Sequence, residues 1–172
     1  MGSGKSVTAT VEAAWAALEH LADPEIPVIS LRELGILRDV RQGADGLEVV
    51  ITPTYSGCPA MGQIEDDVRA ALESAGLPAR VVTRLAPAWT TDWMSDSGKE
   101  KLRAYGIAPP HQTPAGSSVV RFIAKPATAE AVACPHCGSA NTVESSRFGS
   151  TACKALYKCR DCLEPFDYFK PY

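Results

Sequence analysis

Five of the six cysteines lie in the last forty residues, and their spacing carries the strongest chemical signal in the chain. Cys134 and Cys137 form one C-x-x-C pair, and Cys159 and Cys162 form a second. Two residues between thiols let both sulfurs of a tight turn reach one ion, and two such knuckles supply the four sulfurs that Zn²⁺ accepts. Because the protein would fill all four positions, we expect a closed, structural metal site.

Several features of this tail leave alternatives open. Twenty-one residues separate the two pairs, slightly more than the usual zinc-site interval. Four cysteines also suit an iron–sulfur centre, although the ribbon-like spacing favours zinc. Cys153 lies between the pairs and is an alternative ligand, whereas His136, inside the first pair, is expected to face solvent. The aromatic residues within 164–169 are expected to pack against the ribbon, with a partner-binding face as the alternative.

Cys58 stands alone in the first half of the chain, within the stretch TPTYSGCPA over residues 52–60. It lies between the end of a predicted strand and the start of a predicted helix, where backbone N–H groups and the helix dipole stabilise a thiolate. Such a thiol is a candidate nucleophile or soft-metal ligand. The alternative is an inert cysteine that packs as a small apolar side chain. No His/Asp pair at a recognisable offset supports a cysteine hydrolase.

Two further polar segments are weaker candidates for a functional site. Asp23 and Glu25 lie in a Pro-rich turn, where they could be ligands but where solvated turn residues are the simpler interpretation. The N-terminal GSGKS, residues 2–6, ends like a phosphate-binding loop. It lacks the first glycine of that motif and a preceding strand, so we interpret it as a leader.

The apolar pattern predicts six elements before the tail. They are a helix over 7–21, strands over 35–40 and 47–52 that form a hairpin, a helix over 60–75, a strand over 80–85 and a helix over 97–105. Pro24 ends the first helix, and Gly76 and Pro78 end the second. Ser97 and Glu100 have capping-box spacing at the start of the third. This order predicts an α+β fold, a small sheet with helices on one face.

The chain divides into a leader over 1–6, a first domain over 7–125, a linker over 126–131 and a metal-binding ribbon over 132–172. A short strand is predicted over 119–123. A segment as short as the ribbon buries too little surface to fold alone, so the metal would supply the missing stability. We therefore expect chelation to loosen the ribbon and to leave the first domain folded.

Composition excludes several classes of protein. The 172 residues include 17 basic and 20 acidic side chains, a net charge of −3, which gives no excess typical of a nucleic-acid binder. No apolar run approaches the roughly 18 residues of a membrane helix, and no secretory signal is recognisable, so we expect a cytoplasmic protein. Glu19 and His20 are adjacent and do not form the E-x-x-H pattern of di-iron sites. No flavin or nucleotide motif is present.

Two stretches of the chain resemble known families. The segments DPEIPVIS (23–30) and LGILRDV (34–40), with the Cys58-Pro59 motif, PAW at 87–89 and Gly106-Ile107, resemble the SufT-like iron–sulfur assembly domain. The tail, with CPHCGS at 134–139, FGSTACKALYKC at 148–159 and FDYFK at 166–170, is similar to the PaaD family, the D subunits of bacterial phenylacetyl-CoA epoxidase systems. The first resemblance is broad, and only the tail narrows it.

The resemblance implies a site in the first domain. The fold would be that of the small iron–sulfur assembly factors, followed by a zinc-ribbon-like domain. Cys58 would handle iron or a cluster in transit, with Asp23 and Glu25 beside it and Thr54 in the same motif. The structural zinc would belong to the ribbon.

The resemblance also implies an accessory role without intrinsic catalysis. The epoxidase converts phenylacetyl-CoA to a ring epoxide, and a PaaD protein would mature or maintain a metal centre of that complex. The expected partners are the other epoxidase subunits or their reductase, with neither nucleic acid nor membrane. Two alternatives stay open. One is an iron–sulfur electron-transfer component, and the other is a purely structural interaction subunit.

Overall fold

The structure, a computed structural model, describes residues 7–111 and 131–172, with side chains from residue 10 onward. The predicted leader, the predicted strand over 119–123 and all of the predicted linker except residue 131 lie outside the described residues. Contacts divide the chain into two compact units. The first comprises the residues up to Trp89 together with Trp93–Gly98, and the second comprises Thr90–Asp92 together with Lys99–Tyr172.

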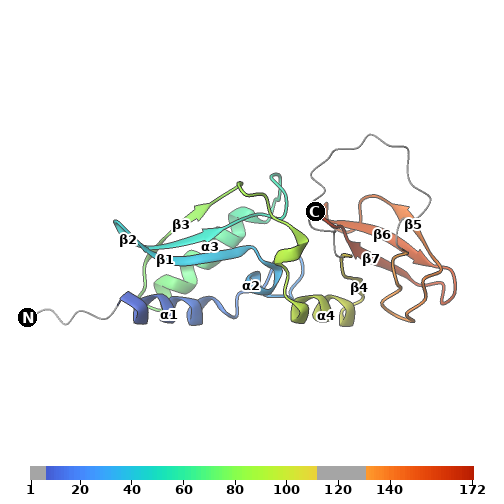
Figure 1. Ribbon diagram of the computed structural model, residues 1–172, viewed down its shortest axis with the longest axis horizontal. Coiled ribbons are helices and arrows are strands. Elements are labelled where there is room, and N and C mark those ends of the chain that lie inside the picture. The colour runs from blue at the N-terminus through green and yellow to red at the C-terminus, as the bar shows by residue number, and fades with distance from the viewer. Residues whose placement is uncertain (1–6, 112–130) are drawn as a thin grey trace, which may run out of the picture. The chain divides into compact units, whose positions relative to one another are not determined.

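The first unit contains a three-stranded sheet with its helices. In chain order its elements are α1 (Val7–Leu18), α2 (Leu31–Leu34), β1 (Leu37–Gly43), β2 (Gly46–Ile51), α3 (Met61–Ser74) and β3 (Ala79–Thr83). The strands β1 and β2 form an antiparallel hairpin, while β2 and β3 run parallel and are joined through α3 (Figure 1). The predicted hairpin and the predicted α+β class are confirmed.

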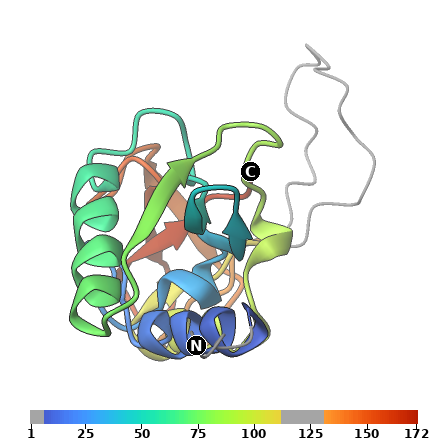
Figure 2. The same cartoon turned by 90° about the vertical axis from the view of Figure 1, so that its left-hand side faces the viewer.

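The core of the first unit follows the two periodicities of the sequence. Val49 and Ile51 alternate along β2 and are fully buried, as are Ile64, Val68 and Leu72 at helical spacing along α3. Helix α1 packs against α3 and β1, and α3 also packs against β3 (Figure 2). The helices thereby cover one face of the sheet.

A short helix, α2, precedes the hairpin and was absent from the sequence-based prediction. Ser30 caps it, since the Ser30 hydroxyl accepts from the Glu33 N–H at 3.1 Å and the Ser30 N–H donates to Glu33 Oε2 at 3.0 Å. Its end is fixed at Gly35, which has φ 80°, and a Cβ there would lie 2.7 Å from the Trp93 carbonyl oxygen. Only glycine fits this position, and the strand predicted over 35–40 therefore begins at Leu37.

Helix α4 (Asp96–Ala104) has a different cap from the predicted one. The hydroxyl of Ser95 accepts from the Gly98 N–H at 3.0 Å, whereas the Ser97 hydroxyl donates to Glu33 Oε1 at 2.6 Å. The predicted pairing of Ser97 with Glu100 is therefore wrong. A capping box has Glu or Gln three residues after the capping serine. Gly98 occupies that position after Ser95, so nothing in the sequence indicated this cap.

The second unit is a four-stranded sheet in the order β4-β7-β6-β5. Its strands are β4 (Ile107–Ala108), β5 (Thr142–Ser146), β6 (Lys154–Cys159) and β7 (Pro165–Phe169). The last three are antiparallel neighbours, and β4 adds to β7 in parallel. The first domain predicted over residues 7–125 includes β4, because a two-residue strand carries no periodicity that reveals its partner.

The aromatic residues of the tail pack inside this sheet, as the sequence predicted. Phe166, Tyr168 and Phe169 are buried, and the first two share a cluster with the ribbon cysteines Cys134 and Cys159.

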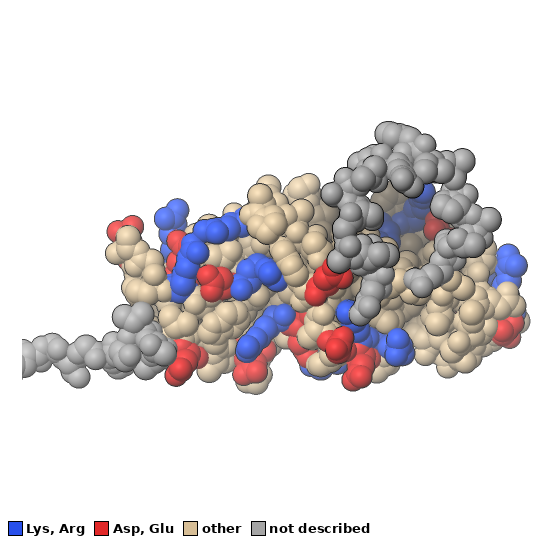
Figure 3. All heavy atoms as spheres, in the orientation of Figure 1, with Lys and Arg blue, Asp and Glu red and all other residues tan. Residues whose placement is uncertain are grey.

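No helix of the described residues is long and apolar enough to cross a bilayer. On the face in Figure 3 the basic and acidic side chains of the described residues are interspersed, in keeping with the balanced composition.

Candidate functional site

The second unit brings the four predicted metal ligands together. The sulfurs of Cys134, Cys137, Cys159 and Cys162 all lie within 4.8 Å of one another, although each pair comes from a separate turn. Among residues 7–111 and 131–172, this is the one group of three or more His, Cys, Asp or Glu side chains placed closely enough to hold a metal.

The separations of these sulfurs fit a single tetrahedral ion. The Cys134 and Cys162 sulfurs are 3.7 Å apart, and those of Cys137 and Cys159 are 3.6 Å apart. A Zn–S bond of about 2.3 Å places the sulfurs of a tetrahedron about 3.8 Å apart. A cluster of several metal ions spreads its thiolates over separate ions and needs wider spacing. The sulfur set is thus preformed for one ion.

Four thiols so close together cannot all ionise without a cation. Backbone hydrogen bonds, first from the Cys162 N–H, lower the pKa of Cys159 to about 7. For Cys162, the Glu164 N–H lowers the pKa, but burial and the three neighbouring thiols outweigh this and raise it to about 12. One sulfur is therefore readily a thiolate, whereas the last proton leaves only when a metal ion compensates the charge.

Each knuckle is followed by a residue in the left-handed backbone conformation, but the residue type differs between the two. After the first pair, Gly138 has φ 77° and its N–H donates to the Cys134 carbonyl at 2.9 Å. The corresponding position after the second pair is Leu163, which has φ 68° and is 65% exposed. A leucine in the left-handed region is strained, so the second knuckle is held in this shape by its surroundings.

Asp161 ties the two knuckles together, a role that was not predicted from the sequence. Its carboxylate accepts from the Ser139 hydroxyl and, at 2.7 Å, from the Asn141 side-chain amide. These hydrogen bonds, that from Ser139 first, lower the pKa of Asp161. The Arg160 N–H adds a bond to the Asn141 carbonyl at 2.8 Å. A charged residue inside one C-x-x-C pair and small polar residues after the other were the available signal.

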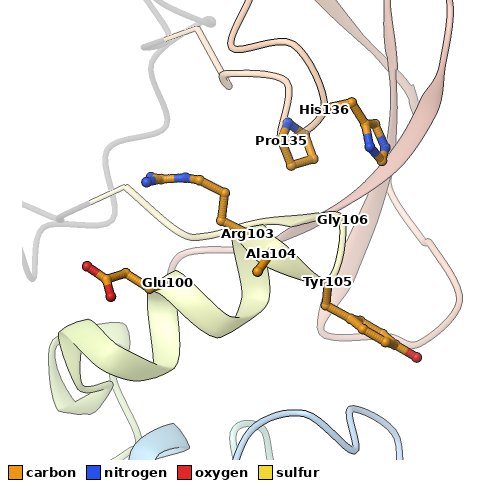
Figure 4. Close-up of a pocket in the computed structure, with 7 residues that line it drawn as sticks. All are labelled: Glu100, Arg103, Ala104, Tyr105, Gly106, Pro135 and His136. Atoms are coloured by element: carbon orange, nitrogen blue, oxygen red, sulfur yellow. The ribbon is translucent and has the colours of Figure 1, made fainter.

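Cys153 and His136 lie apart from the sulfur set. Cys153 is buried, its sulfur lies 3.0 Å from the Thr151 hydroxyl, and it is not a member of the four-sulfur group. His136 is exposed, as predicted, and its ring lies edge-on to Phe166 with centroids 6.5 Å apart. It borders an open hollow of about 410 Å³ between the first knuckle and the end of α4, with Arg103 on the opposite wall (Figure 4).

Cys58 occupies the turn between β2 and α3, where the sequence placed it. It is half-buried, its N–H donates to the Tyr55 carbonyl at 3.2 Å and its carbonyl accepts from the Met61 N–H at 3.4 Å. Helix α3 begins at Met61 with no acidic residue in its first turn and no side-chain cap at Ala60. The positive end of the helix dipole therefore lies beside the cysteine turn without an acidic side chain in the helix's first turn to offset it.

The other three predicted site residues, Asp23, Glu25 and Thr54, differ in burial. Asp23 is buried rather than solvated, and one carboxylate oxygen accepts from the N–H groups of Glu25 and Ile26, both at 2.9 Å. This aspartate shapes the turn after α1, as an Asx turn does. Thr54 is buried and Glu25 half-buried. Within the described parts of the chain, Cys58 belongs to no group of three or more potential metal ligands.

Comparison with known proteins matches both halves of the chain. Residues 11–84 match the family described as iron-sulfur cluster assembly protein, and residues 121–170 match the PaaD zinc beta ribbon domain. The chain is 48% identical over 157 residues to the putative D subunit of the 1,2-phenylacetyl-CoA epoxidase of Escherichia coli, covering 91% of this chain and 90% of that protein. The chain belongs to the PaaD family.

Other proteins similar to this PaaD-family chain match about half of its length. An Fe-S protein maturation auxiliary factor of Porphyromonas gingivalis is 38% identical over 88 residues, 49% of this chain and 83% of that protein. A crystal structure of a domain of unknown function (DUF59) from Bacillus anthracis covers 58% of this chain and 97% of its own, with 29% identity and a TM-score of 0.52. The family resemblance and the fold class expected from the sequence are confirmed.

Proposed function

We propose that this protein is an accessory subunit of a phenylacetyl-CoA 1,2-epoxidase system that assembles or maintains an iron or iron–sulfur centre of the complex. The domain matches and the named relatives support an accessory part in iron–sulfur handling. The observation that carries the proposal is the contrast within one chain between Cys58, which belongs to no group of three potential ligands among the described residues, and a four-sulfur group shaped for one ion.

Cys58 suits a metal in transit because, among the described residues, it is not part of a ready set of three or more metal ligands. Cys58 is half-buried in the turn that precedes α3, and no acidic side chain in the first turn of that helix offsets the positive end of its dipole. A single thiolate holds iron weakly unless other ligands join, so the remaining ligands would come from the donor or the recipient of the metal. Asp23 and Glu25 are proposed to shape the surroundings of this thiol, and Thr54 to support its turn.

The ribbon is proposed to hold Zn²⁺ through Cys134, Cys137, Cys159 and Cys162. With all four positions filled by protein, the ion supplies folding stability and carries out no reaction step. The sulfur separations support one ion, and the ribbon-like spacing favours zinc over iron. The ribbon would present its outer surface to other epoxidase subunits or their reductase.

The experiment that tests the transfer role replaces the thiol alone. Cells that depend on the epoxidase are supplied with the wild type, Cys58→Ala or Ser56→Ala, an exposed neighbour in the same turn. We expect Cys58→Ala to abolish most epoxidase activity and Ser56→Ala to retain it, with equal amounts of each protein in the cells. Unchanged activity in Cys58→Ala would refute metal transfer through this thiol and would leave a structural subunit.

Electron transfer is the competing function, because a tetrahedral S₄ group also fits a single iron. Purified protein would then be coloured, and its visible absorbance would bleach on reduction. A colourless protein with zinc in the ribbon contradicts that alternative.

A further inference from the structure

The ribbon carries a second hollow, remote in sequence from Cys58 and formed by none of the metal-binding cysteines. We call it the aromatic pocket. It has a volume of about 440 Å³ and is lined by Glu144, Arg147, Phe148, Ala155, Tyr157, Tyr168, Lys170 and Pro171. All of these residues belong to the second unit.

Strand register explains why the hollow exists. Ala155 on β6 pairs with Tyr168 on β7, and Tyr157 follows Ala155 on the same face of β6. The rings of Tyr157 and Tyr168 meet edge-on with centroids 5.3 Å apart. The small side chain of Ala155 leaves the space beside these rings that a larger side chain would occupy.

The wall formed by Phe148 is open to solvent. Phe148 is 68% exposed, the largest exposed fraction among the large apolar side chains of the described residues. The Lys170 ammonium lies 4.8 Å from the centre of its ring and also donates to the Arg147 carbonyl at 3.2 Å. These contacts hold an apolar ring in place at the edge of a hollow, an arrangement typical of a binding surface.

The charges at the mouth of the pocket favour an anionic partner. Arg147 has a side chain that is 88% exposed, and Lys170 lies beside it. Glu144 is the one acidic lining residue, and it is engaged by Arg147 at 4.0 Å and by the Tyr157 hydroxyl at 3.4 Å. The net charge at the rim is therefore positive.

We infer that the aromatic pocket binds an acidic polypeptide segment that carries an aromatic side chain, on a partner protein. The aromatic side chain would enter between Tyr157 and Phe148, and flanking carboxylates would face Arg147 and Lys170. The volume suits one or two side chains rather than a folded surface. This inference rests on the docking part of the proposed function and specifies its chemistry.

Binding of synthetic peptides to the full chain tests this inference. Three fluorescent twelve-residue peptides are compared: one with a central Phe flanked by Asp and Glu, one with that Phe replaced by Ala, and one with its acids replaced by Lys. We expect saturable binding of the first, weaker by about tenfold for the second and third. Phe148→Ala and Arg147→Glu should each weaken binding of the first peptide by about tenfold.

Lys158→Glu is the matched control, since it reverses an exposed charge on the opposite face of β6 and should leave binding unchanged. Equal binding of all three peptides, no saturable binding, or an equal loss in Lys158→Glu would overturn the inference. Self-association of the wild type that Phe148→Ala abolishes would also overturn it, in favour of a second copy. Cys58→Ala should keep peptide binding, so failure here and failure of metal transfer are distinguishable.

Discussion

The two cysteine sites of this chain differ in how much of each is built into the fold. In the ribbon, four sulfurs lie at tetrahedral spacing on two knuckles, which are joined by the hydrogen bonds from Ser139 and Asn141 to Asp161, here called the Asp161 clamp. In the first unit, the turn between β2 and α3 carries the half-buried residue Cys58, which lies outside any group of three potential ligands among the described residues. A complete set retains its ion, whereas an incomplete set can release what it binds. In our proposal, cysteine thus retains a metal ion in the ribbon and binds one only transiently in the first unit.

Removal of the metal should give the largest effect on stability, and this effect should be confined to the ribbon. A strong chelator, or Cys137→Ser, should remove the protection of β5, β6 and β7 against hydrogen exchange, because the ion supplies roughly 10–16 kcal/mol in comparable peptides. The strands β1, β2 and β3 should keep their protection. Cys58→Ser is the control and should leave both sheets protected. Loss of protection in both sheets after chelation would contradict separate stabilisation.

A substitution in the first unit should have the converse effect. Gly35→Ala places a Cβ against the Trp93 carbonyl at a left-handed position, so we expect it to lower the free energy of unfolding of this unit by about 2–4 kcal/mol. Metal content should stay at the wild-type level. Gly62→Ala is the matched control, because it has open space in α3 and should stabilise by up to about 1 kcal/mol. Denaturant titration followed by zinc analysis measures both.

The clamp between the knuckles should tune the metal affinity of the ribbon. Asp161→Ala removes the acceptor shared by Ser139 and Asn141, so the first knuckle loses its side-chain tie to the second and keeps the backbone bond from Arg160. Residues that orient ligands in this way change metal affinity by about 10–100-fold, and we expect about tenfold. Competition with a chromophoric chelator measures the change. Arg160→Ala, in the same knuckle, should have less effect, and equal losses in the two variants would argue against a clamp.

Exchanging the residues after the knuckles should give the smallest effect. Leu163→Gly relieves a left-handed leucine and should stabilise the metal-loaded ribbon by about 1 kcal/mol, while Gly138→Ala should destabilise it by a similar amount. Thermal unfolding of the metal-loaded full chain measures both shifts. Shifts of the same sign would mean that the two turns are not equivalent.

The sequence predicted the elements with strong apolar periodicity and the two C-x-x-C pairs of the ribbon. The helices α1, α3 and α4, the hairpin β1–β2 and the gathering of four ribbon sulfurs were all anticipated, because apolar spacing and C-x-x-C pairs act locally. The short helix α2 was missed, although Ser30-Leu31-Arg32-Glu33 has capping-box spacing. Four residues bury too few side chains for periodicity to be visible.

Other features depend on partners distant in the sequence. The addition of β4 to β7 pairs Ile107 with Asp167, and no local pattern of two residues encodes such a partner. The Asp161 clamp joins residues about twenty positions apart, and the aromatic pocket is created by strand register and the small Ala155. Asp23 was interpreted as a solvated turn residue, whereas burial and two backbone hydrogen bonds give it a structural role.

Metal analysis of anaerobically purified protein, before and after reconstitution with ferrous iron and sulfide, tests the contrast between the two sites most directly. The account predicts one zinc per chain in both the wild type and Cys58→Ala, and additional chelator-labile iron in the wild type alone. Iron bound firmly in place of zinc, or the same iron content with and without the Cys58 thiol, would contradict it.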